Sequence, residues 1–399
     1  MSSIKTNIQI SKAITNILSI AFILKTVSVL LEQQQLETQR IDPVLHMGII
    51  ISYFANILFF FAGFLGLKYE GKYYPRYVKK LFWIILLWVV FVYLKSGASI
   101  LNPSVFMGVK GIAPYLGMIV IFTASPERFQ EMRKTFFFVG IILVLGGLFN
   151  TAKLGLSFDR DSAQNQLLLI TVNLVWVAPL ILFYNFKKYK LIAAAIFSFS
   201  FLFSFLIVTR SFMILHLIVL LYFTRYVIKV KLIVLFGIAS LSTIVFFLLP
   251  QVGVIQNATV LLDSRMGEDT RSWQILLFLA TVDYNDFIYG SGVFSFWRMG
   301  NREYEWLDNQ VLLTAWWAGV LPIFCYLVLL IKGVKKFLFK KKSNSIKRSE
   351  AFIVFLWILA LLGFSIFITI SSTLYHFLIL FVLGSLLCKK KNQLVYEVY

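Results

Sequence analysis

Cysteine and histidine are scarce in this sequence of 399 residues, which has 2 cysteines and 3 histidines. Cys325 and Cys388 fall within or at the end of apolar segments, so they cannot build a disulfide framework and redox chemistry is not expected. No cluster of His, Cys, Asp and Glu has the spacing of a metal site, and the sequence has no Walker-type phosphate loop. We therefore expect a protein that works without a metal or another cofactor.

Charge is also scarce, because charged residues make up only 14% of the chain and hydrophobic residues 59%. This composition excludes a soluble globular domain. Runs of about 20 apolar residues recur along the whole length, and no cleavable signal peptide precedes them. We expect an all-α, polytopic integral membrane protein with about twelve spanning helices in a single domain, residues 1–399. The expected spans are 11–31, 44–67, 81–99, 105–124, 135–152, 167–186, 191–209, 211–224, 232–250, 310–331, 351–370 and 374–388.

Acidic residues number 18 against 38 Lys and Arg, which gives a net charge of +20. The basic residues gather in alternate connections between the expected spans, so they indicate topology rather than nucleic-acid binding. The clusters run from Lys68 to Lys80, Arg128 to Lys134, Lys187 to Lys190, Arg225 to Lys231, Lys332 to Arg348 and Lys389 to Lys391. By the positive-inside rule these connections and both termini are cytoplasmic, in a multi-pass protein of the cytoplasmic (inner) membrane.

The opposite side, which faces the periplasm or the cell exterior, carries one long loop at 251–309, between the ninth and tenth spans. A loop of this length is more than a connection, so we expect function there. Within it, the stretch from Arg271 to Tyr284 ("RSWQILLFLATVDY") is apolar enough to form a helix at the membrane interface. The sequence has no internal repeat that would indicate a two-halved transporter.

Arg210 is the most unusual basic residue on the outer side. It lies in "FLIVTRSFMILHL", so two apolar helices must meet there in a tight turn. A charge at this depth either faces a cavity or partner, or snorkels to lipid headgroups. Lys110, inside "FMGVKGIAPYLG", presents the same alternatives. His216, in the helix after Arg210, reads as a packed polar residue rather than a ligand.

Arg265 and Arg271 stand six residues apart in "LLDSRMGEDTRSWQ". Guanidinium groups offer paired donors that suit phosphate oxygens, so three arginines in one outer cavity would suit a diphosphate. Neighbouring carboxylates offer the alternative that these arginines only form salt bridges within the loop. These carboxylates are Asp263, Glu268 and Asp269.

The end of the loop adds polar and small residues. Gly290 and Gly292 in "YGSGVFSF" permit a tight turn or a close backbone approach. Asp308 and Asn309 stand just before the next span, where Asp308 is either a helix cap or a carboxylate that accepts a proton. Several tryptophans are suited either to stacking on sugars or to anchoring at the membrane interface. They are Trp273, Trp297, Trp306, Trp316 and Trp317.

The order of these motifs resembles the O-antigen polymerase (Wzy-type) and O-antigen ligase superfamily of polytopic membrane glycosyltransferases. The matching pieces are "TRS" at 209–211, R-x5-R-x-W from Arg265 to Trp273, "GSGVFSF" at 290–296 and "DNQVLLTAWWAGVLP" at 308–322. The resemblance covers the helix count, the place of the long loop and, in detail, residues 200–325. It implies a GT-C-like fold and transfer of a glycan from a polyprenyl diphosphate carrier to an acceptor sugar, without a metal.

Carried over by position, Arg210, Arg265 and Arg271 would grip the diphosphate, and Asp308 would deprotonate the acceptor. We expect the substrate also to contact Lys110, Trp273, Asn309, Gly290 and Gly292. The ligase branch usually has a His before this Asn, whereas this chain has Asp308, which favours a polymerase of O-antigen, capsule or exopolysaccharide. A chain-length regulator protein is a further partner that the resemblance implies. A ligase acting on a lipid A core, a lipid-linked oligosaccharide transporter and a scaffold protein are the alternatives.

Overall fold

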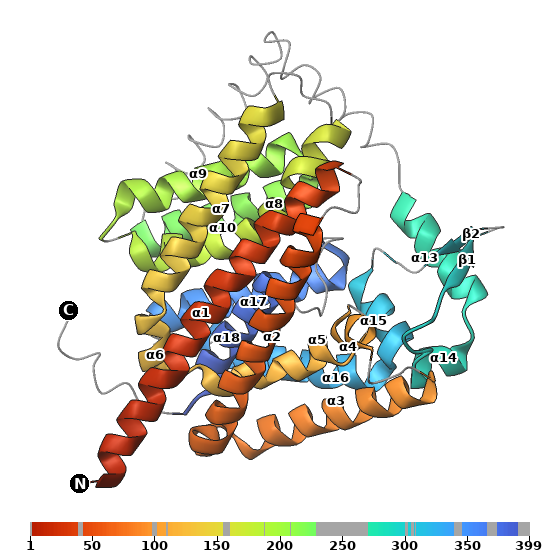
Figure 1. The fold of residues 1–399 in the computed structure, drawn as a ribbon, viewed down its shortest axis with the longest axis horizontal. Helices are drawn as coiled ribbons and strands as arrows, with labels where there is room; N and C mark the ends of the chain where they lie inside the picture. The colour runs from red at the N-terminus through yellow and green to blue at the C-terminus, as the bar shows by residue number, and fades with distance from the viewer. Residues whose placement is uncertain are drawn as a thin grey trace. The chain divides into compact units, whose positions relative to one another are not determined.

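The computed structural model describes residues 2–38, 43–97, 102–108, 111–154, 160–186, 188–207, 209–228, 270–299, 302–304, 307, 309–338, 345–364 and 373–389. This part of the chain is almost entirely helical, with one short β-hairpin (Figure 1). Contacts divide the chain into two compact units. We call Met1–Lys25, Ile50–Thr135 and Thr270–Tyr399 the N–C unit, and Thr26–Ile49 with Phe136–Asp269 the central unit.

Within the described residues, five helices are long and apolar enough to cross a membrane, which confirms an all-α membrane protein. They are α1 (Ser2–Thr38), α2 (Pro43–Tyr69), α3 (Arg76–Lys95), α7 (Arg133–Leu154) and α8 (Arg160–Asn185). Their apolar stretches coincide with five of the twelve expected spans. Shorter apolar helices form at two further expected spans, α9 (Lys190–Leu206) and α18 (Leu374–Leu387). The expected span 232–250 lies outside the described residues.

The expectation of one continuous helix at 105–124 is wrong. The described residues there form α4 (Pro103–Met107), α5 (Ala113–Leu116) and a 3-10 helix, η2 (Gly117–Thr123). Every residue of η2 is buried. A Cβ atom at Gly66 of α2 would lie 2.6 Å from the Phe122 carbonyl oxygen, and one at Gly384 of α18 would lie 2.2 Å from that of Ile121. The thin 3-10 segment thus packs against the glycine faces of two neighbouring helices.

The expectation of one continuous helix at 310–331 is also wrong. The chain forms α15 (Gln310–Ala318) and α16 (Val320–Leu338), which are separated at Gly319. Gly319 has φ of +86°, a left-handed conformation that only glycine adopts readily. The expected span 351–370 begins earlier, as α17 (Ser345–Leu359), and continues into the π-helix η5 (Ala360–Phe364).

The described end of the long loop, residues 270–309, is called the loop segment below. It holds α13 (Thr270–Thr281), which confirms a helix where the sequence predicts one, and the short helix α14 (Tyr284–Tyr289). Strands β1 (Trp297–Met299) and β2 (Arg302–Tyr304) then pair antiparallel, with Trp297 opposite Tyr304. The sequence analysis does not predict this hairpin, because its strands are only three residues long, which is too short for a periodic pattern to be recognised.

The central unit contains most of α7, together with α8, α9 and α10 (Arg210–Tyr222). After Tyr222 the helix continues as a π-helix, η3 (Phe223–Ile228). Glycines again allow close packing, because a Cβ atom at Gly147 of α7 would lie 2.3 Å from the ring of Phe203 on α9.

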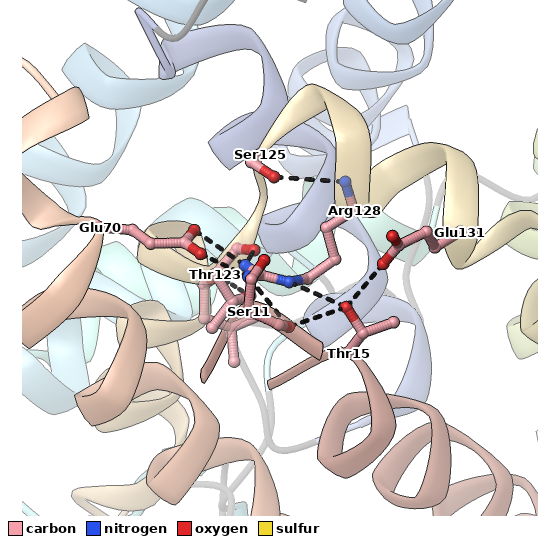
Figure 2. A network of polar contacts seen from close by, with 8 residues as sticks. Ser11, Thr15, Glu70, Thr123, Ser125, Arg128 and Glu131 are labelled. Atoms are coloured by element: carbon pink, nitrogen blue, oxygen red, sulfur yellow. Dashed lines mark hydrogen bonds and ion pairs between the residues drawn. The ribbon is translucent and has the colours of Figure 1, made fainter. Parts of the chain in front are cut away.

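A buried arginine of α6 (Pro126–Glu131) joins the first half of α1 to the residue that follows α2 in the N–C unit (Figure 2). Arg128 is 1% exposed and donates to both carboxylate oxygens of Glu70, at 2.9 and 2.5 Å. It also donates to the carbonyl of Thr123, to Oγ1 of Thr15 at 3.2 Å and to Oγ of Ser11 at 2.9 Å. Arg128, which the sequence places in a basic cluster between two expected spans, is therefore a buried structural ion-pair partner.

Candidate functional site

Arg210 is the first residue of α10 and its side chain is exposed. The neighbouring residues on both sides, Thr209 and Ser211, are each 8% exposed. The backbone N–H groups of Phe212 and Met213 donate to the carbonyl of Thr209, so the helix starts at once after the turn. The tight turn that the sequence predicts between α9 and α10 is thereby confirmed.

A cation at this position does not help the helix. The amino end of a helix carries a partial positive charge, which favours anions there and cations at the opposite end. Arg210 therefore adds its charge to a place that is already suited to an anion. Its position agrees with an anion-binding role, and the interaction of its side chain with lipid headgroups remains the alternative.

His216 lies two turns farther along α10 and is 2% exposed. Its Nδ1 is 2.7 Å from the carbonyl oxygen of Phe212 and its Nε2 is 2.7 Å from Oγ of Ser200. The carbonyl can only accept, so Nδ1 carries the proton and Nε2 accepts from Ser200. The prediction that His216 is a packed polar residue is confirmed.

Arg271 is the second residue of α13. Like Arg210, it therefore stands in the first turn of a helix. Trp273, two residues farther along α13, is 63% exposed, and Leu276 is 61% exposed. The opposite face of α13 buries Phe278 completely. This division between an apolar exposed face and a packed face is typical of a helix at a membrane interface.

Gly290 and Gly292 form the tight turn that the sequence predicts, with φ of +87° and +89°. The turn packs on the carboxyl end of α15. Ser291 donates its backbone N–H and its hydroxyl to the carbonyl of Trp316, both at 2.8 Å, and Gly292 donates its N–H to the carbonyl of Trp317 at 3.1 Å. These N–H groups are used inside the protein, so the visible role of both glycines is structural.

Helix α3 also stabilises the break after α15. Trp88 Nε1 donates to the carbonyl of Ala318 at 2.9 Å. A Cβ atom at Gly292 would lie 2.4 Å from Cβ of Ser96, just beyond the end of α3. The three last carbonyls of α15 are thus bonded by the glycine turn and by α3, as the end of a helix in an apolar environment requires.

Asn309 is the N-cap residue of α15, because its Oδ1 accepts from the backbone N–H of Leu312 at 3.0 Å. Substitution of such a cap usually weakens a helix, so Asn309 has a clear structural role. Asp308 lies outside the described residues, as do Arg265, Lys110 and Trp306. The capping of α15 by the adjacent Asn309 means that this helix does not depend on Asp308 for its cap.

Three of the tryptophans considered for sugar stacking are core residues. Trp297, Trp316 and Trp317 are at most 6% exposed and form one cluster with Phe278, Leu307 and Leu313. The ring of Phe278 contacts those of Trp297 and Trp316 edge-on, at centroid distances of 5.7 and 5.5 Å. The cluster fixes α13 and β1 on α15, so these rings anchor the loop segment. Among the described tryptophans of this region, Trp273 alone is exposed.

The chain matches no protein-family model, no curated protein and no solved structure. Function must therefore be argued from its own residues. Arg271, Trp273, Gly290, Gly292 and Asn309 belong to the N–C unit, and Arg210 belongs to the central unit.

Lys25 is a buried residue of the N–C unit that was not predicted as a candidate. This residue of α1 is 4% exposed and donates from Nζ to Oγ of Ser52 at 2.5 Å and to Oδ1 of Asn56 at 3.1 Å, both on α2. The signal was visible as a single charge inside the apolar run "SIAFILKTVSVL". A charge within a span is rare and usually functional or paired.

A second buried polar group lies between α16, α17 and α18. Trp357 Nε1 donates to the hydroxyl oxygen of Tyr326 at 2.9 Å, and that hydroxyl is 3.3 Å from Nε2 of His376. All three side chains are completely buried, and the rings of Trp357 and His376 are stacked. No periodic or spacing signal predicts this group, because each member comes from a different helix.

Proposed function

We propose that the chain is a polysaccharide polymerase, which transfers a growing glycan from a polyprenyl diphosphate carrier to the next lipid-linked repeat unit on the outer face of the cytoplasmic membrane. The observation that carries this proposal is the position of Arg210 and Arg271, each in the first turn of an apolar helix. Helix stability alone would disfavour both positions, whereas a bound diphosphate would use the guanidinium and the helix end together.

The proposed chemistry needs two protein functions. A glycosyl diphosphate is an activated donor, so the bond from the anomeric carbon to the diphosphate oxygen breaks as the acceptor hydroxyl forms the new glycosidic bond. Arg210, Arg265 and Arg271 would stabilise the negative charge on the departing diphosphate. Asp308 would accept the proton of the attacking hydroxyl, and a single in-line displacement would invert the anomeric centre. No step in this scheme requires a metal.

The loop segment supports the proposal in two further ways. The exposed ring of Trp273 lies two residues from Arg271 and is suited to contact a sugar face or the carrier lipid. The cap of α15 is Asn309, so Asp308 can serve as a base without a loss of the helix start.

The decisive experiment uses the purified full chain in liposomes with a polyprenyl-diphosphate-linked repeat unit as the only substrate. A ladder of multiples of the repeat unit on a gel would establish polymerisation. Transfer only to an added lipid A core would indicate a ligase. Binding of the lipid-linked unit without any new glycosidic bond would contradict both transferase assignments.

Arginine-to-lysine variants test the residues themselves. We expect Arg210→Lys and Arg271→Lys each to lower polymer formation at least about tenfold, because lysine lacks the paired planar donors that suit a diphosphate. The matched control is Arg298→Lys, since Arg298 is an exposed residue of β1 that pairs with Glu303 at 3.1 Å. Its ladder should equal that of the wild type. Full activity in either test variant would remove that arginine from the site.

Transport of lipid-linked oligosaccharide is the second candidate, and two observations favour it. Helices α15 and α16 are interrupted at Gly319, and Lys25 is a buried charge within a span. Interrupted helices and buried charges are common at transport sites. Movement of a fluorescent lipid-linked oligosaccharide across the liposome membrane, with no polymer formed, would select this function.

A further inference from the structure

A basic cavity of about 550 Å³ opens in the N–C unit, and its lining includes none of the residues proposed for the transfer reaction. It is lined by Pro75, Arg76, Tyr77, Lys332, Leu386, Leu387 and Lys389. These residues come from the start of α3, the second half of α16 and the end of α18. Three cationic side chains therefore surround one hollow whose wall includes two buried leucines.

No acidic side chain is present among the residues that line the cavity. Within the described part of the chain, the side chains of Arg76, Lys332 and Lys389 form no ion pair. Glu70, the carboxylate nearest in sequence to Arg76, is already bound on both oxygens by Arg128. Glu350 lies near the end of α18, where Lys347 and Ser385 already donate to its carboxylate. Three like charges around one hollow repel one another, so an anion bound between them would be stabilised by all three.

The backbone adds to this preference. Arg76 and Tyr77 are the first residues of α3, a helix of 20 residues, and the N–H groups of a first turn have no partner within the helix. Lys389 is held in place because its own N–H donates to the carbonyl of Tyr73 at 2.8 Å.

The cavity lies where membrane-spanning helices end. Arg76 is the first residue of a candidate span, and Leu387 is the last residue of the apolar helix α18. Polar headgroups occupy this level of a bilayer, and the acyl chains begin just below it. Leu386 and Leu387 supply apolar wall on the side of the span.

We propose that this basic cavity is a binding site for a phosphoryl group at the membrane surface, supplied either by the headgroup of an anionic phospholipid or by free phosphate. The positive-inside rule predicts that this surface is cytoplasmic, so the site would be separate from an outward-facing transfer reaction. The proposal does not depend on the polymerase function.

The test uses the purified full chain in a neutral detergent and measures bound lipid by native mass spectrometry. The probes are dioctanoyl phosphatidylglycerol, dioctanoyl phosphatidylcholine and inorganic phosphate. The pocket variant carries Arg76→Gln, Lys332→Gln and Lys389→Gln. The matched control carries Lys72→Gln, Lys80→Gln and Lys190→Gln, which remove the same charge from exposed lysines that do not line the cavity.

For phosphatidylglycerol we expect the Kd of the pocket variant to be at least about tenfold higher than that of the wild type, and that of the control to change less than about threefold. Phosphatidylcholine should bind more weakly than phosphatidylglycerol to the wild type. The single variant Lys332→Gln should show a smaller loss, which guards against misfolding of the triple variant. Equal loss in the pocket variant and the control would overturn the proposal, as would unchanged binding in the pocket variant.

Inorganic phosphate separates the two sources. Displacement of phosphatidylglycerol from the wild type by millimolar phosphate, and not by equal ionic strength of chloride, would assign the site to a free phosphate compound. Retention of the lipid in phosphate would assign it to the phospholipid headgroup. If neither phosphatidylglycerol nor phosphate binds to the wild type, the cavity is not a phosphoryl site.

Discussion

Arg128 and Glu70 form an ion pair whose side chains are 0% and 13% exposed. Removal of one partner leaves a charge in a region that excludes water. We expect Arg128→Met or Glu70→Leu alone to lower the free energy of unfolding by about 3–5 kcal/mol. The double variant should lose clearly less than the sum of both, because neither charge is then left unpaired. Denaturation in detergent, followed by circular dichroism, measures all three.

The exposed pair Arg298–Glu303 provides the control for this cycle, with side chains 67% and 52% exposed. Arg298→Met should change the free energy of unfolding by less than about 1 kcal/mol, because water already solvates both charges. If the loss of unfolding free energy in the double variant equals the sum of the losses for Arg128→Met and Glu70→Leu, the energetic coupling that the ion-pair geometry indicates is contradicted.

Asp308 and Asn309 are neighbours with separable expected roles. Asn309→Ala removes the hydrogen bond to the N–H of Leu312 and should lower the free energy of unfolding by about 1 kcal/mol, while polymer formation persists. Asp308→Asn should leave stability close to that of the wild type and abolish polymer formation, because an amide cannot accept the proton. Thermal unfolding and the polymer ladder are measured on the same preparations. The reverse pattern would make Asp308 a structural residue.

Residue-level predictions from the sequence were best where the local chain decides the outcome. His216 bonds to Phe212 four residues earlier, and the Gly290–Gly292 turn needs only two left-handed conformations. The ion pair of Arg128 was not predicted, because its partner, Glu70, is 58 residues away in sequence. For the same reason the sequence does not distinguish buried from exposed roles for Trp297, Trp316 and Trp317. Their burial depends on packing against elements that are distant in sequence.

Packing of whole helices depends on a few glycines. A Cβ atom at Gly384 would lie 2.2 Å from the carbonyl oxygen of Ile121, and backbone cannot move aside cheaply. We expect Gly384→Ala to lower the free energy of unfolding by about 1–3 kcal/mol through overpacking. Thermal unfolding of the purified protein tests this.

Gly71→Ala is the matched substitution, because its Cβ atom would meet the end of the Lys79 side chain at 3.2 Å and Cδ1 of Leu67 at 3.5 Å, which is an ordinary van der Waals contact. That side chain can rotate away, so the change in unfolding free energy should stay within about 0.5 kcal/mol. Equal effects of the two alanine substitutions would mean that η2 is not held between α2 and α18 as closely as the distances indicate.

The long spans were predictable element by element, and the interrupted ones were not. A run of apolar residues as long as the bilayer is thick fixes a helix such as α2 without help from its neighbours. The 3-10 segment at Gly117–Thr123 exists because Gly66 and Gly384 approach it. The break at Gly319 exists because Ser291, Gly292 and Trp88 bond the carbonyls of α15. Those partners are distant in sequence, so periodicity alone gives a continuous helix.

The predicted orientation of the whole molecule in the membrane rests on the distribution of lysine and arginine. It can be tested by single cysteine substitutions in a variant in which the native Cys325 and Cys388 are replaced by alanine. Both native cysteines are buried. Tyr284, in the loop segment, is 81% exposed, and Lys188 is also exposed. Tyr284→Cys should react with an impermeant maleimide on intact cells, and Lys188→Cys only after permeabilisation. The opposite pattern would place the loop segment in the cytoplasm and remove the basis for an outward-facing polymerase.

The joint at Gly319 also bears on how the chain is synthesised. Without hydrogen-bond donors, the last carbonyls of α15 would be costly in lipid, since no water is available to bond them. Trp88, Ser291 and Gly292, which bond these carbonyls, all precede Trp316–Ala318 in the sequence. The ribosome therefore delivers every donor before the acceptors leave the tunnel. This interrupted helix can complete its hydrogen bonds during membrane insertion, before α17 and α18 have been translated.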